Sequence, residues 1–190
     1  MIVEISKYYI RKCEEFAEKQ IETSHHLYRY RGEKNMEKMK EDIKIGKMGE
    51  LGVYTYLKEH GYDPKKPDFK VYKNRNKSFD ADILTICGKK IHVKSQGEQS
   101  VKRYGASWLL QKEDKITKFP TKDDFIVMCK VYGREVEILG AIEVKDLLEY
   151  NLLEEPRVPR YRHTKRALYF ASLENSEANI YQLGLEEYKK

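Results

Sequence analysis

The fold is decided by residues 80–96, which read Asp80-Ala-Asp82-Ile-Leu-Thr-Ile-Cys-Gly-Lys-Lys-Ile-His92-Val-Lys94-Ser-Gln96. The apolar runs on either side of Gly88-Lys89 predict two short strands, over 82–87 and 90–96, joined by a tight turn. Side chains alternate between the two faces of a strand. One face of this hairpin is therefore apolar enough to be core, and the other brings together Asp82, His92, Lys94 and Gln96.

The composition fits one ordinary domain with a very ionic surface. Of the 190 residues, 36% are charged and 40% are hydrophobic, and 37 basic against 31 acidic residues give a net charge of +6. A chain of this length supports one hydrophobic core. The basic balance is compatible with a polyanionic partner, so the distribution of the charge matters more than its size.

Several classes of protein are disfavoured by what the sequence lacks. The three cysteines, Cys13, Cys87 and Cys129, form no CxxC pair, so neither a zinc site nor a disulfide framework is expected. This cysteine usage favours a reducing, cytoplasmic location. No apolar run approaches the about 20 residues of a membrane span, and the first residues do not resemble a signal peptide, so we expect no membrane partner. There is no GxxxxGK(S/T) loop, so we expect no nucleotide cofactor.

Hydrophobic periodicity predicts two N-terminal helices followed by several strands. Helices are expected over 5–22 and 43–60, separated by a polar, basic segment that runs from a loop into a helix over 24–42. Gly46, Gly49 and Gly52 recur in the second helix. Each costs about 1 kcal/mol relative to alanine, so close packing against a sheet or a ligand is the expected compensation.

The rest of the chain alternates strands with short helices. Besides the hairpin, strands are expected over 69–72, 108–110, 125–132 and 135–144. A further strand, at a sheet edge, is expected over 167–171. Helices are expected over 145–153 and 177–188, and a basic loop over 157–166. This order predicts an α+β or α/β fold, with a mixed central β-sheet flanked by helices.

The polar face of the hairpin has the residue types that metal-assisted phosphodiester hydrolysis needs. Carboxylates must hold a divalent metal, which neutralises the phosphate and lowers the pKa of bound water, and a cation must stand near the scissile group. Asp82 can anchor the metal, Glu50 on the glycine-rich helix can supply a second carboxylate, and Lys94 can be the cation. Mg²⁺ prefers oxygen ligands and keeps several waters, so these groups suffice with a backbone carbonyl near Val93.

These residues resemble the PD-(D/E)xK nuclease superfamily, which has the restriction-endonuclease-like fold. The family pattern is a helical Glu, an Asp that opens the second core strand and an acid-x-Lys on the third strand; Glu50, Asp82 and His92-Val93-Lys94 match it by position. The motif covers residues 43–96, and the later strands to residue 145 fit the fold in order. The resemblance implies a nuclease that uses Mg²⁺ (or Mn²⁺), acts on DNA, works as a homodimer and leaves 5′-phosphate and 3′-hydroxyl ends, with Lys94 near the attacking water.

His92 departs from this pattern, because the family has an acid at that position. Imidazole suits Zn, Mn, Fe, Co or Ni better than Mg. His92 either ligates the metal directly, or hydrogen-bonds a metal-bound water while Asp80 or Glu50 supplies the missing charge, or marks a site that only binds. Pro67-Asp68 also spells the nominal PD of the family, but we prefer Asp82 because it begins the strand that pairs with the strand of Lys94. Gln96, on the same face, is expected to touch the scissile phosphate or a base.

Basic residues cluster beyond this site, where phosphate contacts are expected. The expected DNA-binding residues are Lys102, Arg103, Arg157, Arg160, Arg162, Lys165 and Arg166.

We therefore expect a single nuclease domain over residues 1–190. It comprises a helical extension (1–42), a catalytic core (43–145) and a C-terminal basic loop, strand and helix (146–190). The predicted activity is metal-dependent cleavage of double-stranded DNA of the restriction type. The alternatives are a structure-specific junction or repair nuclease and, because of His92, a catalytically inactive DNA-binding module.

Overall fold

The computed structural model describes residues 1–30, 34–71, 81–85 and 88–181. Its helices are α1 (Lys7–Tyr30), α2 (Met36–Glu59), α3 (Glu98–Tyr104), α4 (Lys115–Lys118), α5 (Val144–Glu149) and α6 (Phe170–Glu174), with a 3-10 turn over Pro159–Tyr161. Its strands are β1 (Ile2–Glu4), β2 (Ile83–Leu84), β3 (Lys90–Gly97), β4 (Ser107–Gln111), β5 (Asp124–Tyr132), β6 (Glu135–Glu143), β7 (Leu153–Glu154) and β8 (Lys165–Tyr169). No helix among the described residues has both the length and the apolar character needed to cross a bilayer.

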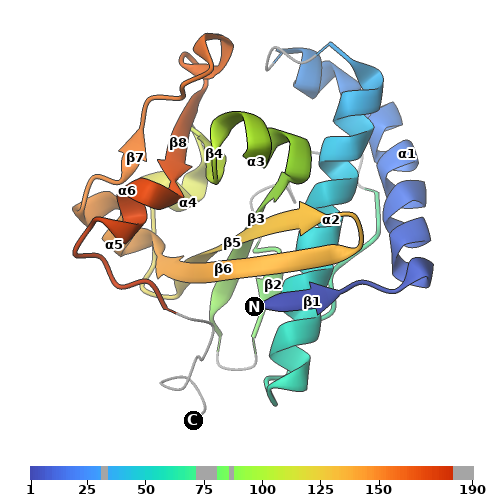
Figure 1. Ribbon diagram of the computed structural model, residues 1–190, viewed down its shortest axis with the longest axis horizontal. Coiled ribbons are helices and arrows are strands. Elements are labelled where there is room, and N and C mark those ends of the chain that lie inside the picture. Colours follow the sequence, from blue (N-terminus) through green and yellow to red (C-terminus); the bar gives the residue numbers. More distant parts are fainter. Residues whose placement is uncertain (31–33, 72–80, 86–87, 182–190) are drawn as a thin grey trace.

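A mixed five-stranded sheet forms the centre of the molecule, in the order β1-β6-β5-β3-β2. Strands β3 and β5 are parallel, and the other neighbours are antiparallel. The crossover between β3 and β5 contains α3, β4 and α4, because parallel neighbours need a long connection. Figure 1 shows the helical pair α1 and α2 on one side, and the second sheet, β4-β8-β7, with α5 and α6 on the other. The predicted α+β class with a mixed central sheet is confirmed.

Helix α2 lies directly on the central sheet because two of its glycines leave room for the strands. A Cβ on Gly49 would lie 1.8 Å from Ser95 Oγ of β3, and a Cβ on Gly52 would lie 2.6 Å from Val136 Cγ1 of β6. This is the predicted close packing against a sheet. Gly46 is different, since a Cβ there would meet no heavy atom within 4 Å.

Two hydrophobic cores lie on opposite faces of the central sheet. The core on the helical side joins α2 residues such as Leu51 and Val53 to Ile91 and Val93 of β3. The other core packs the second sheet, including Trp108, against Ile126 and Met128 of β5. The indole Nε1 of Trp108 also donates a hydrogen bond of 3.0 Å to the carbonyl of Cys129, where the β5–β6 register shifts. The polar tip of a buried tryptophan thus stabilises an irregular point of the sheet.

Some element boundaries differ from the sequence predictions, and packing is the physical reason. The first helix was expected over 5–22, but α1 continues to Tyr30, and α2 begins at Met36 rather than at 43, capped by the side chain of Asn35. The α1–α2 contact is buried by Ala17, Ile21, Met39 and Ile43. These apolar residues are sparse in a polar segment, so their burial depends on the partner helix.

Several further expectations are corrected or lie beyond the described residues. The strand expected over 82–87 is limited to Ile83–Leu84, with residues 86–87 outside the described residues, where the candidate Asp80 also lies. Residues 69–71 form no strand, residue 72 lies outside the described residues, and the short strand β1 was not predicted. The strand predicted at an edge is β8, which pairs with both β4 and β7 and is therefore central in the second sheet. Residues 177–181 are not helical, and 182–190 lie outside the described residues; α6 lies earlier, at Phe170–Glu174.

Candidate functional site

The predicted hairpin forms, and it places Asp82 at an open edge of the central sheet. Ile83 pairs with Ile91 and Leu84 with Lys90, so β2 covers only the beginning of β3. Just beyond this pairing, Asp82 Oδ2 accepts a hydrogen bond of 2.8 Å from the backbone N–H of Val93. The carboxylate of Asp82 thus lies beside β3, one residue before Lys94.

Glu50 approaches the same place from α2, since Gly49 packs against Val93 and Ser95 of β3. The carboxyl of Glu50 is largely buried, with 14% of the side chain exposed. Burial raises the pKa of Glu50, and the charge of Asp82 raises it further. Two carboxylates from separate elements are therefore electrostatic neighbours, as the sequence predicted for Glu50 and Asp82.

Lys47, which the sequence analysis missed, offsets part of this negative charge. Its Nζ lies 2.5 Å from Glu50 Oε2, and only 12% of the lysine side chain is exposed. The ammonium also lies 4.9 Å from the ring centroid of Phe16 and 5.8 Å from that of Phe69, a favourable cation–π arrangement. The signal was present in the sequence, because residues three apart on a helix are neighbours.

Asp68 is a second residue whose importance the sequence analysis underestimated. Its charge also raises the pKa of Glu50, by less than the charge of Asp82 does. The preference for Asp82 over Asp68 remains supported, because Asp82 accepts a hydrogen bond from the backbone of the strand that bears Lys94.

Lys94 lies half-buried in the middle of β3. Strand alternation directs its side chain to the face opposite that of Val93, and so away from α2. Its ammonium makes no hydrogen bond or ion pair with any of the described residues. Glu50 on α2 and Lys94 therefore lie on opposite sides of β3, and Asp82 lies at its open edge, where β2 no longer covers the strand.

The structure does not bring His92 to the two carboxylates. The imidazole is buried, and its Nε2 lies 3.0 Å from Asp124 Oδ1 at the start of β5. Asp124 also accepts hydrogen bonds of 2.7 Å from the backbone N–H and 2.6 Å from the hydroxyl of Thr121. The prediction that His92 is a metal ligand therefore receives no support from this geometry, in which the ring links β3 to the first residue of β5.

Asparagine at position 124 is expected to destabilise the fold by about 1 kcal/mol at neutral pH and by less in acid. Burial alone would raise the pKa of Asp124, but the hydrogen bonds from Thr121 and His92 outweigh it and hold the pKa below its usual value. A carboxyl with a lowered folded-state pKa stabilises the protein fully above about pH 4, and this stabilisation is lost as the pH falls through the folded-state value.

Urea unfolding of the wild type and of Asp124→Asn at neutral and acidic pH measures how much this carboxylate stabilises the fold. The difference in the free energy of unfolding should shrink between about pH 7 and about pH 3. An equal difference at both ends would contradict the assignment of the lowered pKa to this network.

Gln96 is also held by neighbouring protein groups. Its amide Nε2 donates to Gly105 O at 3.0 Å and to Ser100 Oγ at 3.1 Å, and its Oε1 accepts from the backbone N–H of Ser107 at 2.9 Å. The side chain is buried. Gln96 therefore fastens the start of β4 to β3, and its expected contact with a phosphate or base is not supported by this arrangement.

The predicted DNA-binding residues lie on two segments that Figure 1 shows at the same end of the molecule: α3, and the β7–β8 connection with the start of β8. On α3, Lys102 pairs with Glu98 at 2.6 Å, and the guanidinium of Arg103 lies 5.3 Å from the ring centroid of Tyr104. Both side chains of the Lys102–Glu98 pair are exposed. Such a pair contributes little to stability, so Lys102 remains available to exchange partners.

Along the β7–β8 connection and β8, basic side chains pack against tyrosine rings. The guanidinium of Arg157 lies 4.3 Å from the Tyr169 ring, and Arg160 and Lys165 lie 4.8 Å and 4.3 Å from the Tyr161 ring. Arg162 differs from these, since its Nε donates to Pro156 O at 3.1 Å and faces Glu155. Arg166 lines a separate pocket.

The Glu50–Asp82 pair fits a hard divalent cation. Mg²⁺ is commonly held by one or two carboxylates together with several waters, and a cation between these two groups would relieve the repulsion that raises the pKa of Glu50. Among the described residues, no group of three or more His, Cys, Asp or Glu side chains is arranged to hold a metal.

Comparison of the chain with models of protein families, with curated proteins and with solved structures gave no match.

Proposed function

We propose that this protein is a metal-dependent DNA endonuclease of the restriction-endonuclease-like fold. One observation carries the proposal: the largely buried carboxyl of Glu50 on α2 is an electrostatic neighbour of Asp82, which precedes β2 and binds the backbone at the open edge of β3. The order of elements supports it, since the helix with Glu50 precedes the hairpin with Asp82 and Lys94, and a parallel strand follows.

Each residue has a distinct part in the proposed chemistry. Glu50 and Asp82 bind the metal, which supplies Lewis acidity toward the scissile phosphate. Lys94 reaches the edge of β3 from the opposite face, where its ammonium orients the attacking water and stabilises the charge that develops on the phosphate. Lys47 keeps the two carboxylates compatible with burial while the site is empty. The basic residues on α3 and before β8 hold the DNA backbone.

Cleavage of supercoiled plasmid tests the proposal through its metal requirement. We expect nicking or linearisation with Mg²⁺ or Mn²⁺ and none with EDTA. Discrete fragments indicate the restriction type of activity on double-stranded DNA, whereas preferential cutting of a four-way junction indicates a structure-specific nuclease. Symmetric double-strand cuts would agree with a homodimer, which sedimentation measures directly.

A second function is favoured by the position of His92. Because its ring is paired with Asp124 and lies away from Glu50 and Asp82, the family's acid-x-Lys element lacks its first ligand. This observation suits a DNA-binding module without cleavage. Equal inertness with every divalent metal, together with retention of DNA in a gel, would select this second function over the nuclease.

A further inference from the structure

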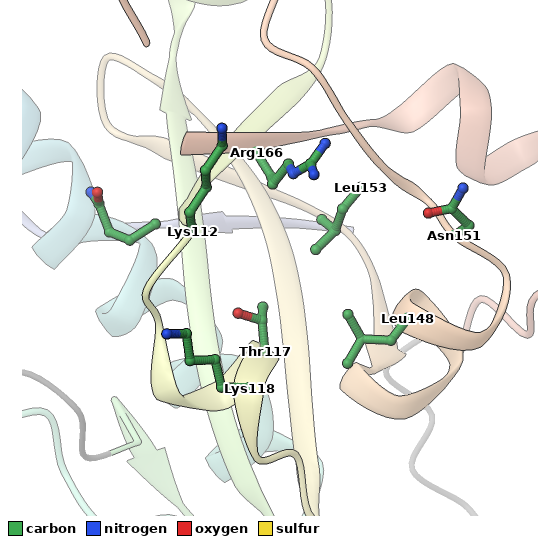
Figure 2. Close-up of a pocket in the computed structure, with 8 residues that line it drawn as sticks. Lys112, Thr117, Lys118, Leu148, Asn151, Leu153 and Arg166 are labelled. Atoms are coloured by element: carbon green, nitrogen blue, oxygen red, sulfur yellow. The ribbon is translucent and has the colours of Figure 1, made fainter. Parts of the chain in front are cut away.

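A basic pocket lies in the second sheet, separate from the Glu50–Asp82 pair. It has a volume of about 330 Å³ and is formed where the end of β4, α4, the α5–β7 turn and β8 come together (Figure 2). This volume is at the lower end of the about 300–1,000 Å³ that is usual for small-molecule sites.

Three cationic side chains, Lys112, Lys118 and Arg166, line this pocket (Figure 2). Arg166 lies opposite Leu110 in the β4–β8 ladder, and Lys112 directly follows β4, so strand alternation puts Lys112 and Arg166 on the same face of the second sheet. Neither of these two side chains forms a hydrogen bond or an ion pair within the described part of the chain. Lys118 is paired with Glu113.

The charge of the pocket suits a doubly charged anion. No carboxylate is among the described residues that line it, and Glu113 offsets about one of the three positive charges. The remaining charge of about +2 matches a phosphomonoester, which carries about −1.5 to −2 at neutral pH. A phosphodiester carries one charge and needs less compensation. The planar guanidinium of Arg166 adds the bidentate geometry that phosphate oxygens favour.

The opposite wall of the pocket is apolar, with one amide beside it. Leu148 is 36% exposed, and Figure 2 shows it with Leu153 and Asn151 on the side away from the two lysines. Leucine side chains suit the flat face of a nucleobase better than a sugar, whose surface is covered with hydroxyls. Figure 2 shows the guanidinium of Arg166 extending toward this wall, so it would stand between a phosphate held by the two lysines and a base held by the leucines.

Asn151 holds an unusual backbone conformation at this wall. Its φ is 51°, and it ends α5 where the N–H of Leu152 donates to Leu147 O at 3.0 Å and its own N–H donates to Leu148 O at 3.1 Å. Glycine is the commonest residue at such a left-handed helix end, and asparagine is a less frequent one. Asparagine keeps the helix cap and adds an amide that can hydrogen-bond a ligand.

We propose that this pocket binds a nucleoside 5′-phosphate, with the phosphate on Lys112, Lys118 and Arg166 and the nucleoside against Leu148 and Leu153. This chemistry has two sources: a free mononucleotide, or the 5′-phosphorylated end of a nucleic-acid strand. The inference goes beyond the proposed cleavage and does not depend on it, because binding in the pocket requires neither Glu50 nor a metal.

Calorimetric titration in excess EDTA tests the inference separately from cleavage. Adenosine 5′-monophosphate is compared with adenosine, and a short 5′-phosphorylated single-stranded DNA with the same strand ending in 5′-hydroxyl. We expect the phosphorylated member of at least one pair to bind at least about 10-fold more tightly, in line with one charge-assisted contact. A preference only in the first pair identifies the free mononucleotide, and a preference in the second identifies the strand end.

Matched variants locate the binding. The double variant Lys112→Gln, Arg166→Gln should remove the preference for the phosphate, whereas Arg11→Gln, Lys19→Gln, which removes the same charge from the exposed face of α1, should retain it. The variant Asn151→Gly keeps the left-handed cap while deleting the amide, so it should fold normally and weaken both members of a pair equally. The proposal is wrong if neither pair shows a preference, or if the two double variants behave alike.

Discussion

Alanine at position 94 is expected to lower the rate of plasmid cleavage by about 100- to 1,000-fold, the usual cost of deleting one group that stabilises charge in a transition state. Lys94 is half-buried, and its ammonium makes no ion pair with the described residues, so its removal breaks no ion pair within the described structure. Folding, measured by thermal unfolding, should therefore change little while the chemistry is lost.

Lys90 provides a matched control for this experiment. It lies on the same strand and, by alternation, on the same face, four positions earlier, where β2 covers the strand. Lys90→Ala should cleave at nearly the wild-type rate and Lys94→Ala should still retain DNA in a gel. Equal activity of Lys94→Ala and Lys90→Ala would falsify the role given to Lys94.

Alanine at Gly52 should destabilise the protein by about 2 kcal/mol, although alanine is the better helix former. A Cβ at this position would lie 2.6 Å from Val136 Cγ1 and 2.7 Å from Val136 Cβ, deep in the core. Valine cannot rotate its Cβ away, so the helix or the strand must shift, and such overpacking typically costs about 1–3 kcal/mol. The gain in helix propensity offsets about 1 kcal/mol of the cost at most.

Gly46, in the same helix, is a position where alanine is expected to change the stability in the opposite direction. Because a Cβ there meets nothing within 4 Å, Gly46→Ala should stabilise the protein by up to about 1 kcal/mol. Denaturant unfolding of both variants gives the two free-energy changes. If both substitutions changed stability in the same direction, the contact of α2 with β6 described above would be incorrect.

The two hairpins were predictable because their pairing depends on local sequence. Gly88 has a φ of 82° and Gly133 a φ of 56°, the left-handed conformation that glycine adopts readily. Alternating apolar residues on either side fixed the strands, and the structure has them at β2–β3 and β5–β6. The close approach of α2 to the sheet was predictable for a similar reason. Glycine is unfavourable inside a helix, so Gly49 and Gly52 indicated a contact that compensates for it.

Pairings between distant segments could not be predicted in the same way. The strand expected at an edge, β8, is central because β4 approaches it from far upstream and β7 from the other side. The length of α1 depends on α2, which buries its sparse apolar residues. In both cases the segment that stabilises the element lies elsewhere in the chain, so the local hydrophobic pattern does not indicate it.

The candidate site shows the same division between local and distant information. The sequence alone determined that Asp82, His92, Lys94 and Gln96 lie on one hairpin, because strand alternation and the turn suffice for this. Only the tertiary structure decided which of them have other partners. The imidazole of His92 is hydrogen-bonded to Asp124, and the amide of Gln96 is hydrogen-bonded to Ser107 and its neighbours. Only the packing of α2 on β3 brought Glu50 to Asp82, because a contact between a helix and a strand edge depends on how the whole chain buries its apolar faces.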